Sequence, residues 1–200
     1  MKKWLLGGLI AIAVIVGIGV RAFSRPYTFR GSPVDPPMPA PDFALNDQHE
    51  QPFRLSDQRG KLVLLFFGYT NCPDVCPTTL AQFSQVRTQL GSQAQKVRFV
   101  FITIDPERDT PERMKTYLDG IDQNIVGLSG SQADLESAWR GYGVYHQQQS
   151  DSSAGNSLDV IEHSAPVYLV DARGNLRLTY PPVPTVGDLL QDIRYLLREG

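Results

Sequence analysis

The sequence lacks the excess of basic residues that binding to nucleic acid requires. Its formal net charge is −2, and residues 1–30 hold five basic residues and no acidic ones. The remaining residues, 31–200, hold 14 basic and 21 acidic residues, a formal charge of −7. Nucleic-acid affinity depends on a basic patch that neutralises phosphates. We therefore expect no nucleic-acid partner.

Cysteine is also scarce, because Cys72 and Cys76 are the only two in the chain. One interpretation is a structural disulfide or a pair of buried thiols. A cross-link that closes a loop rarely needs cysteines so close together and flanked by prolines. The spacing favours instead a redox pair, a metal clamp, or a site that serves as both.

The N-terminal region contains no cysteine for lipid attachment, but it has a long apolar run. Trp4–Val20 is free of charged residues and follows two lysines. Its 17 residues lie at the short end of the range of roughly 17–25 that spans a bilayer. A cleaved signal peptide is the alternative, although residues 20–22 make a poor cleavage site. We predict an uncleaved membrane anchor over residues 1–23.

Beyond the anchor, composition predicts two further regions. Residues 24–41 contain six prolines and indicate a semi-rigid linker. Residues 42–200 form the globular domain. Lys2 and Lys3 favour a cytoplasmic N-terminus, but arginines also follow the apolar run, so charge alone does not settle the orientation. We expect a single-pass protein of a bacterial inner membrane whose domain faces the periplasm or extracytoplasmic side.

The cysteines lie where a strand passes into a helix. An apolar run at residues 62–67 ends at Gly68, and apolar residues recur at helical spacing after Cys76. Pro77 suits the first turn of a helix, which places Cys76 at the helix start and Cys72 on the loop before it. Helix N-termini favour negative charge, so we expect both sulfurs to ionise readily.

The remaining pattern predicts a thioredoxin-like α/β fold. A hairpin is expected within residues 43–55, a second buried strand at 97–104, and a helix capped by Thr110. Two strands within residues 167–180 precede an amphipathic C-terminal helix. This βαβ…αββα order favours a mixed central sheet flanked by helices.

A metal clamp would need a further ligand besides the two thiolates. Of the three histidines, His163 precedes the strand at 167–170, and this segment abuts the cysteine loop in a thioredoxin-like sheet. A capping or core histidine is an equally good interpretation of His163. Two thiolates and one imidazole suit Cu(I) or zinc, but structural zinc needs a fourth ligand and none is evident.

Three motifs occur together in order. They are residues 72–77 (CPDVCP), residues 105–110 (DPERDT) and His163-Ser164 ahead of Tyr168-Leu169. In this combination the sequence resembles the SCO/SenC family, the copper chaperones for assembly of cytochrome c oxidase. The resemblance covers roughly residues 40–198.

The resemblance implies that Cys72, Cys76 and His163 bind copper. The ligand types leave open whether the physiological ion is Cu(I), Cu(II) or both. The resemblance further implies an upstream copper donor and delivery to the Cu(A) centre of cytochrome c oxidase subunit II. Asp105 belongs to the aspartate motif of the family and either supports the metal site or forms a turn at the strand end. Arg108 and Asp109 are expected to form a local ion pair and a helix cap.

The chain is therefore interpreted as a metallochaperone, not an enzyme. A thiol–disulfide oxidoreductase is the main alternative, with Cys72 and Cys76 as its redox-active pair. A thiol peroxidase is more distant. Thr70 lies two residues before Cys72, but a peroxidase also needs an arginine to activate the thiolate, and the sequence assigns none.

Overall fold

The structure is a computed structural model that describes residues 27–144, 146–148, 161–163 and 166–199, with 146–148 and 161–163 described in their backbone only. Within these residues no helix has both the length and the apolar character to cross a membrane. The predicted anchor, residues 1–23, lies outside the described part of the chain.

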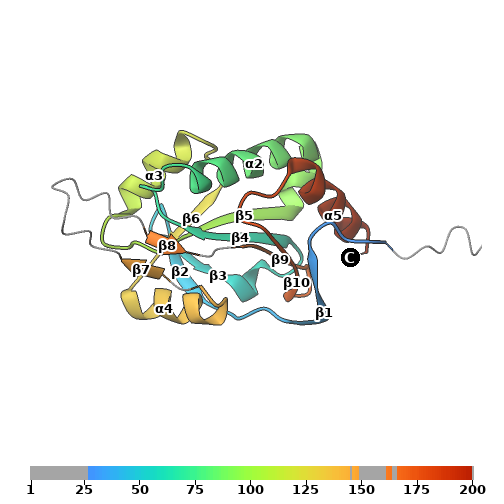
Figure 1. Cartoon of the computed structure of the whole chain (residues 1–200), viewed down its shortest axis with the longest axis horizontal. Coiled ribbons are helices and arrows are strands. Elements are labelled where there is room, and N and C mark those ends of the chain that lie inside the picture. Colours follow the sequence, from blue (N-terminus) through green and yellow to red (C-terminus); the bar gives the residue numbers. More distant parts are fainter. Residues whose placement is uncertain (1–26, 145, 149–160, 164–165, 200) are drawn as a thin grey trace, which may run out of the picture.

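The described residues form strands, α-helices and two short 3-10 helices, labelled as in Figure 1. The strands are β1 (Ser32–Pro39), β2 (Ala44–Asp47), β3 (Pro52–Arg54), β4 (Leu62–Gly68), β5 (Val97–Thr103), β6 (Val126–Ser129), β7 (His146–Gln148), β8 (Ile161–His163), β9 (Val167–Val170) and β10 (Asn175–Tyr180). The helices are η1 (Leu55–Gln58), α2 (Val75–Leu90), η2 (Gly91–Lys96), α3 (Pro111–Asp119), α4 (Gln132–Gly141) and α5 (Val186–Glu199).

Eight strands form one mixed sheet in the order β1-β10-β9-β4-β5-β6-β2-β3. The pairs β4–β5 and β5–β6 are parallel, whereas β4 pairs antiparallel with β9. Figure 1 shows α2, α3 and α5 on one side of the sheet and α4 on the other. The predicted thioredoxin-like plan, a mixed sheet between helix layers, is confirmed.

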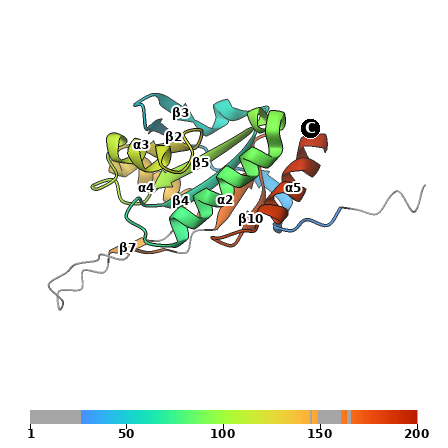
Figure 2. The same cartoon turned by 90° about the horizontal axis from the view of Figure 1, so that it is seen from above.

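Strand β4 lies at the centre of the sheet because all seven of its residues are apolar or glycine and all are buried. Such a run fits a strand that is covered by other elements on both faces. Helix α2 packs above it, seen from above in Figure 2, and buries Leu80, Phe83 and Val86 in the same core. This packing fixes where the chain leaves β4 and enters α2.

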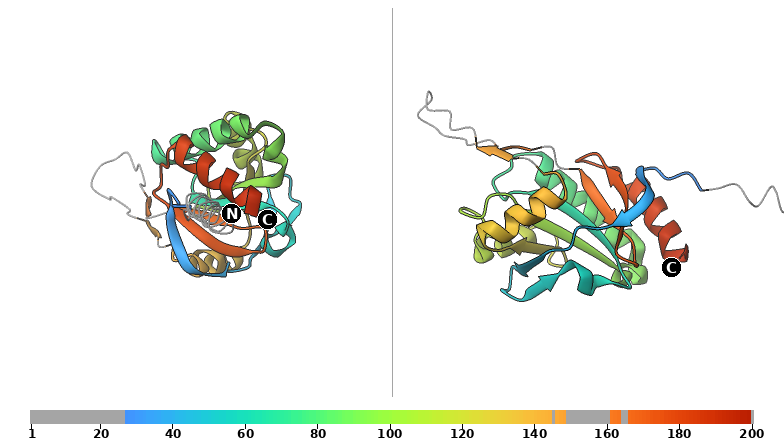
Figure 3. Two further views of the ribbon diagram at one scale, coloured as in Figure 1. Left: turned by 90° about the vertical axis from the view of Figure 1, so that its right-hand side faces the viewer. Right: turned by 90° about the horizontal axis from the view of Figure 1, so that it is seen from below.

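The sheet begins inside the segment that composition indicated as a linker, because Ser32–Pro39 forms strand β1 and pairs with β10. The residues before it are held to α5. The buried Asp192 carboxylate accepts hydrogen bonds from the Tyr27 hydroxyl (2.7 Å), the Arg30 and Gly31 amides and the Tyr180 hydroxyl. Figure 3 shows β1 and α5 together at one end of the domain. The chain therefore enters the domain along a fixed path.

Strands β7 and β8 form a separate two-stranded antiparallel ribbon in which His146 is the direct partner of His163. Figures 1 and 2 show this ribbon at the end of the sheet where β4 passes into α2. Figure 3 shows it at the end opposite to β1 and α5. The backbone of β8 is thus brought to the same end of the domain as the cysteine loop.

Candidate metal centre

The cysteine loop, residues 69–74, connects β4 to α2. The Cys72 amide donates to the Tyr69 carbonyl (3.2 Å), which closes a tight turn. The Cys76 amide, in the first turn of α2, donates to Cys72 Sγ (3.4 Å). Cys72 Sγ therefore accepts one of the amides that the first turn of α2 leaves without a partner inside the helix. Both cysteines are thiols, as the site requires, and they lie within contact of each other.

The two sulfurs have different surroundings. Cys72 is half-buried, whereas Cys76 is fully buried. A hydrogen bond with Cys72, together with burial, raises the pKa of the Cys76 thiol well above its ordinary value. The expectation that the helix N-terminus would make both sulfurs ionise readily is wrong for Cys76, because the hydrogen bond with Cys72 and burial together outweigh the helix end. A cation that binds both sulfurs must displace the proton from Cys76.

Gly68 gives the Cys76 sulfur its space. A Cβ at Gly68 would lie 2.7 Å from Cys76 Sγ and 2.7 Å from Phe101 Cε2, closer than packed atoms allow. The end of β4 must therefore be glycine for Cys76 to point into the core.

Gly68→Ala is expected to lower the free energy of unfolding by about 1–3 kcal/mol, because the added methyl overpacks the core at Cys76 and Phe101. Urea unfolding of the metal-free chain measures this. The matched control is Gly187→Ala in α5, where the nearest atom lies 3.9 Å from the added Cβ. Equal stability of Gly68→Ala and the wild type would show that the pocket around Cys76 is looser than described.

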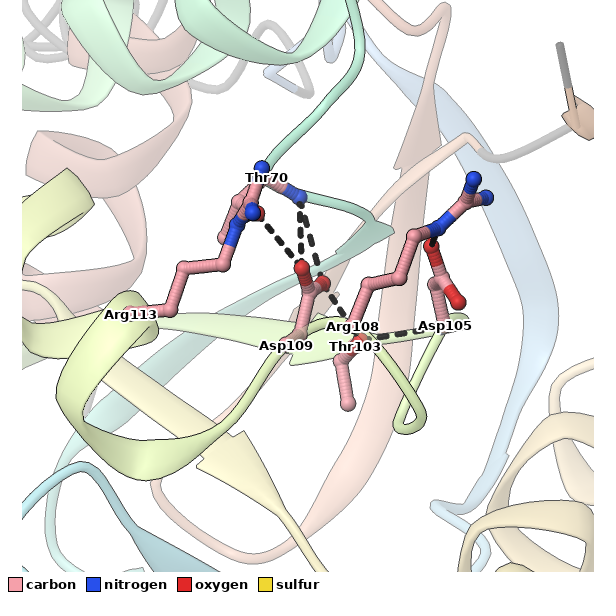
Figure 4. Close-up of polar contacts among 6 residues, drawn as sticks. All are labelled: Thr70, Thr103, Asp105, Arg108, Asp109 and Arg113. Atoms are coloured by element: carbon pink, nitrogen blue, oxygen red, sulfur yellow. Dashed lines mark hydrogen bonds and ion pairs between the residues drawn. The ribbon is translucent and has the colours of Figure 1, made fainter. Parts of the chain in front are cut away.

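A buried carboxylate fastens the start of the cysteine loop. Asp109 accepts hydrogen bonds from the Thr70 amide (3.1 Å), the Thr70 hydroxyl (2.5 Å) and the Thr103 hydroxyl (2.7 Å), as Figure 4 shows. Burial raises the pKa of Asp109, although these hydrogen bonds oppose the shift. The loop two residues before Cys72 is thus tied to the segment that follows β5.

The predicted ion pair between Arg108 and Asp109 is wrong. Arg108 pairs with Asp105 instead, and Asp109 turns inward to the cysteine loop. The carbonyl of Asp105 accepts the amides of Arg108 (3.2 Å) and Asp109 (2.9 Å), which confirms its place in a turn at the strand end. The helix cap belongs to Thr110, as predicted, because its hydroxyl accepts the Arg113 amide.

Asp109→Ala is expected to lower the free energy of unfolding by about 3 kcal/mol, because the Thr103 hydroxyl and both donors of Thr70 lose their acceptor. Asp109→Asn is the matched control, since it keeps one acceptor oxygen and removes a carboxylate whose ionisation burial opposes. Chemical denaturation at neutral pH compares them. The assignment fails if the alanine variant is as stable as the asparagine variant.

Sequence reasoning missed two further residues at this site, both on α3. The Arg113 guanidinium donates to the Thr70 hydroxyl (2.8 Å), so an arginine does lie beside the cysteine loop. Tyr117, the second residue, lies one turn further along α3. It lines one hollow together with Thr70 and Arg113. Only the packing of α3 against the loop reveals these neighbours.

The third predicted ligand is only partly located. The backbone of His163 ends β8, and its side chain lies outside the described residues. Among the described side chains no group of three cysteine, histidine or acidic residues could hold a metal. The structure therefore brings Cys72 and Cys76 together, and the role of His163 stays a prediction. The cis or trans state of the bond before Pro166 also lies outside the described residues.

Comparison with known proteins gives a consistent result. The sequence profile of the SCO1/SenC family matches residues 34–198. An SCO2-like protein of Rickettsia felis is 35% identical over 134 residues, which cover 66% of this chain and 64% of that protein. The chain thus spans slightly less than two thirds of the length of that relative.

Two solved structures are similar over most of the chain. Bradyrhizobium japonicum ScoI, determined with copper bound, is 35% identical with a TM-score of 0.70, over 83% of this chain and 98% of that one. The apo Sco1 protein of Thermus thermophilus is 36% identical with a TM-score of 0.74, over 85% of this chain and 98% of that one.

Proposed function

The chain belongs to the SCO1/SenC family, and from that premise we propose that it is a copper metallochaperone whose site is Cys72, Cys76 and His163. Copper is its cargo. Delivery to the Cu(A) centre of cytochrome c oxidase subunit II, after loading by an upstream donor, is the function that the resemblance supports. The copper-bound relative from Bradyrhizobium japonicum supports the choice of metal.

One observation carries the proposal: two thiols in contact at the N-terminus of α2, with the Cys76 amide aimed at Cys72 Sγ. Thiolates select soft cations such as Cu(I). An amide that donates to sulfur binds a thiolate more strongly than a thiol, so the helix end favours the metal-bound state. A half-exposed Cys72 lets an incoming ligand of a partner reach the ion.

The N-terminal region supports placement at a membrane. We propose that Trp4–Val20 anchors the chain and that the domain lies on the extracytoplasmic side. The contacts of Asp192 hold the segment that follows this region against α5. The cysteine loop and the β7–β8 ribbon lie at the opposite end of the domain, which suits a site that must meet other proteins.

A thiol–disulfide oxidoreductase remains the second candidate, because the contact between Cys72 and Cys76 also suits disulfide formation. In that reaction the two thiols would lose two electrons and two protons and form one disulfide. The target disulfide would gain them and become two thiols. The same residues would serve both functions, so only measurement of metal binding separates them.

The test is an anaerobic titration of the reduced chain with Cu(I) against a chromophoric chelator. One tightly held copper per chain is the expected result. Absence of tight binding, with a disulfide that forms and reduces readily, would overturn the copper proposal in favour of the oxidoreductase.

A further inference from the structure

Tyr117 has a buried hydroxyl with no hydrogen-bond partner among the described residues. The hydroxyls of three other buried tyrosines each have one. Tyr142 donates to the Pro41 carbonyl, Tyr168 to the Tyr142 carbonyl and Tyr180 to Asp192. A buried donor without an acceptor costs free energy, and natural structures contain few of them. The isolated hydroxyl of Tyr117 therefore requires an explanation.

The position of Tyr117 relates it to the cysteines. Its ring packs on Phe101, with ring centres 6.0 Å apart, and Phe101 approaches the same side of Gly68 as Cys76 Sγ. Tyr117 also lines the hollow that begins at Thr70, two residues before Cys72. Burial, with the charges of Cys76, Cys72 and Asp109, raises the pKa of Tyr117, which agrees with this placement.

Of Cys72, Cys76 and Asp109, Asp109 already has hydrogen-bond donors. Its two oxygens accept from the Thr70 amide and from the hydroxyls of Thr70 and Thr103. Arg113, which also lines the hollow, is a donor and offers nothing to a hydroxyl proton. The sulfurs are the acceptors that remain. In the metal-free chain both are thiols, and a thiol sulfur is a weak acceptor.

We propose that Tyr117 is a positioning residue whose hydroxyl donates to a cysteine sulfur once Cys72 and Cys76 are thiolates that hold a soft cation. This inference rests on the proposed copper function. A thiolate is a much stronger acceptor than a thiol, because the bond becomes charge-assisted. The hydroxyl is unsatisfied in the empty site and satisfied in the loaded one. Tyr117 therefore favours loading by the free energy of the hydrogen bond that its hydroxyl makes in the loaded site and lacks in the empty one.

The experiment compares wild type, Tyr117→Phe and Tyr180→Phe as full chains, reduced and free of oxygen. Cu(I) affinity is measured by competition with a chromophoric chelator, and stability by thermal unfolding of the metal-free proteins. Tyr117→Phe is expected to bind Cu(I) about tenfold more weakly, a change of about 1.4 kcal/mol. Its metal-free stability should equal or exceed that of wild type, because an unpartnered hydroxyl is removed.

Tyr180→Phe is the matched control, since its hydroxyl is bonded to Asp192 on α5. It should show the reverse pattern, with lower stability and unchanged Cu(I) affinity. Sulfur-to-copper charge-transfer absorption of the Cu(II) forms gives a second readout. Loss of a hydrogen bond to sulfur should shift the band in Tyr117→Phe alone.

Two results would overturn the inference. If Tyr117→Phe binds Cu(I) as tightly as wild type with an unshifted band, the hydroxyl does not contact the loaded site. If the metal-free variant is destabilised as much as Tyr180→Phe, the hydroxyl has a partner in the empty state. In both cases, tight Cu(I) binding by the wild-type chain would leave the proposed function intact. Failure of wild type to bind Cu(I) overturns the proposed function and the inference together.

Discussion

Cys72→Ser and Cys76→Ser are each expected to abolish tight Cu(I) binding, with affinity falling by at least about a thousandfold. A serine hydroxyl does not ionise near neutral pH and is a hard ligand, so each variant leaves the soft cation one thiolate. Anaerobic competition with a chromophoric chelator measures the loss. Stoichiometric tight binding in either variant would contradict a site that needs both sulfurs.

The structure predicts that Cys72→Ser keeps the fold. Cys72 Sγ accepts the Cys76 amide at the start of α2, and a serine hydroxyl can accept the same amide. The metal-free Cys72→Ser chain should therefore be at least as stable as wild type. Cys76→Ser is expected to be less stable than wild type. Cys76 is fully buried, so the introduced serine hydroxyl would need a new hydrogen-bond partner in the core. Loss of copper by a fully folded Cys72→Ser chain thus cannot be ascribed to unfolding.

The sequence predicted those parts of the fold that depend on local pattern. The apolar run of β4 favoured a covered strand, and Gly68 and Pro77 marked its junction with α2. Thr110 and Pro111 marked the start of α3. These signals are local, since each depends on the burial or backbone geometry of a few adjacent residues.

Strand β1 could not be predicted from the same rules, because its prolines favour a linker. Proline lacks the amide that a central strand needs, but an edge strand tolerates it where the missing amide would face away from the sheet. β1 is an edge strand and pairs only with β10. Whether a proline-rich segment stays free or pairs with a sheet depends on an edge that other parts of the chain create.

The support of the cysteine loop was missed for a different reason. Local reasoning paired Arg108 with its neighbour Asp109, whereas Asp109 bonds Thr70, 39 residues away. No periodicity or cap signal connects two such positions. The same holds for Tyr117, which no local pattern connects with the cysteine loop. The role proposed for its hydroxyl depends on Cys72 and Cys76, which lie on other parts of the chain.

His163→Ala is expected to weaken Cu(I) binding by about a hundredfold or more while leaving the dithiol couple almost unchanged. Removal of an imidazole takes one of three ligands, but Cys72 and Cys76 still form and break their disulfide. Copper competition and redox titration in glutathione buffers measure the two properties on the same variant. If the chain is an oxidoreductase without a copper role, His163→Ala should change neither the copper affinity nor the dithiol couple.

His146→Ala provides a matched control, because backbone register places His146 directly opposite His163 in the β7–β8 ribbon. Both variants remove an imidazole from the same ribbon, so any general effect on that ribbon should be common to them. A loss of Cu(I) affinity that is confined to His163→Ala would identify His163 as the third ligand. Equal losses would instead show that the ribbon as a whole supports binding, and the three-ligand site would have to be abandoned. Because the two histidines share strand pairing but differ in proposed role, this comparison separates coordination from structure.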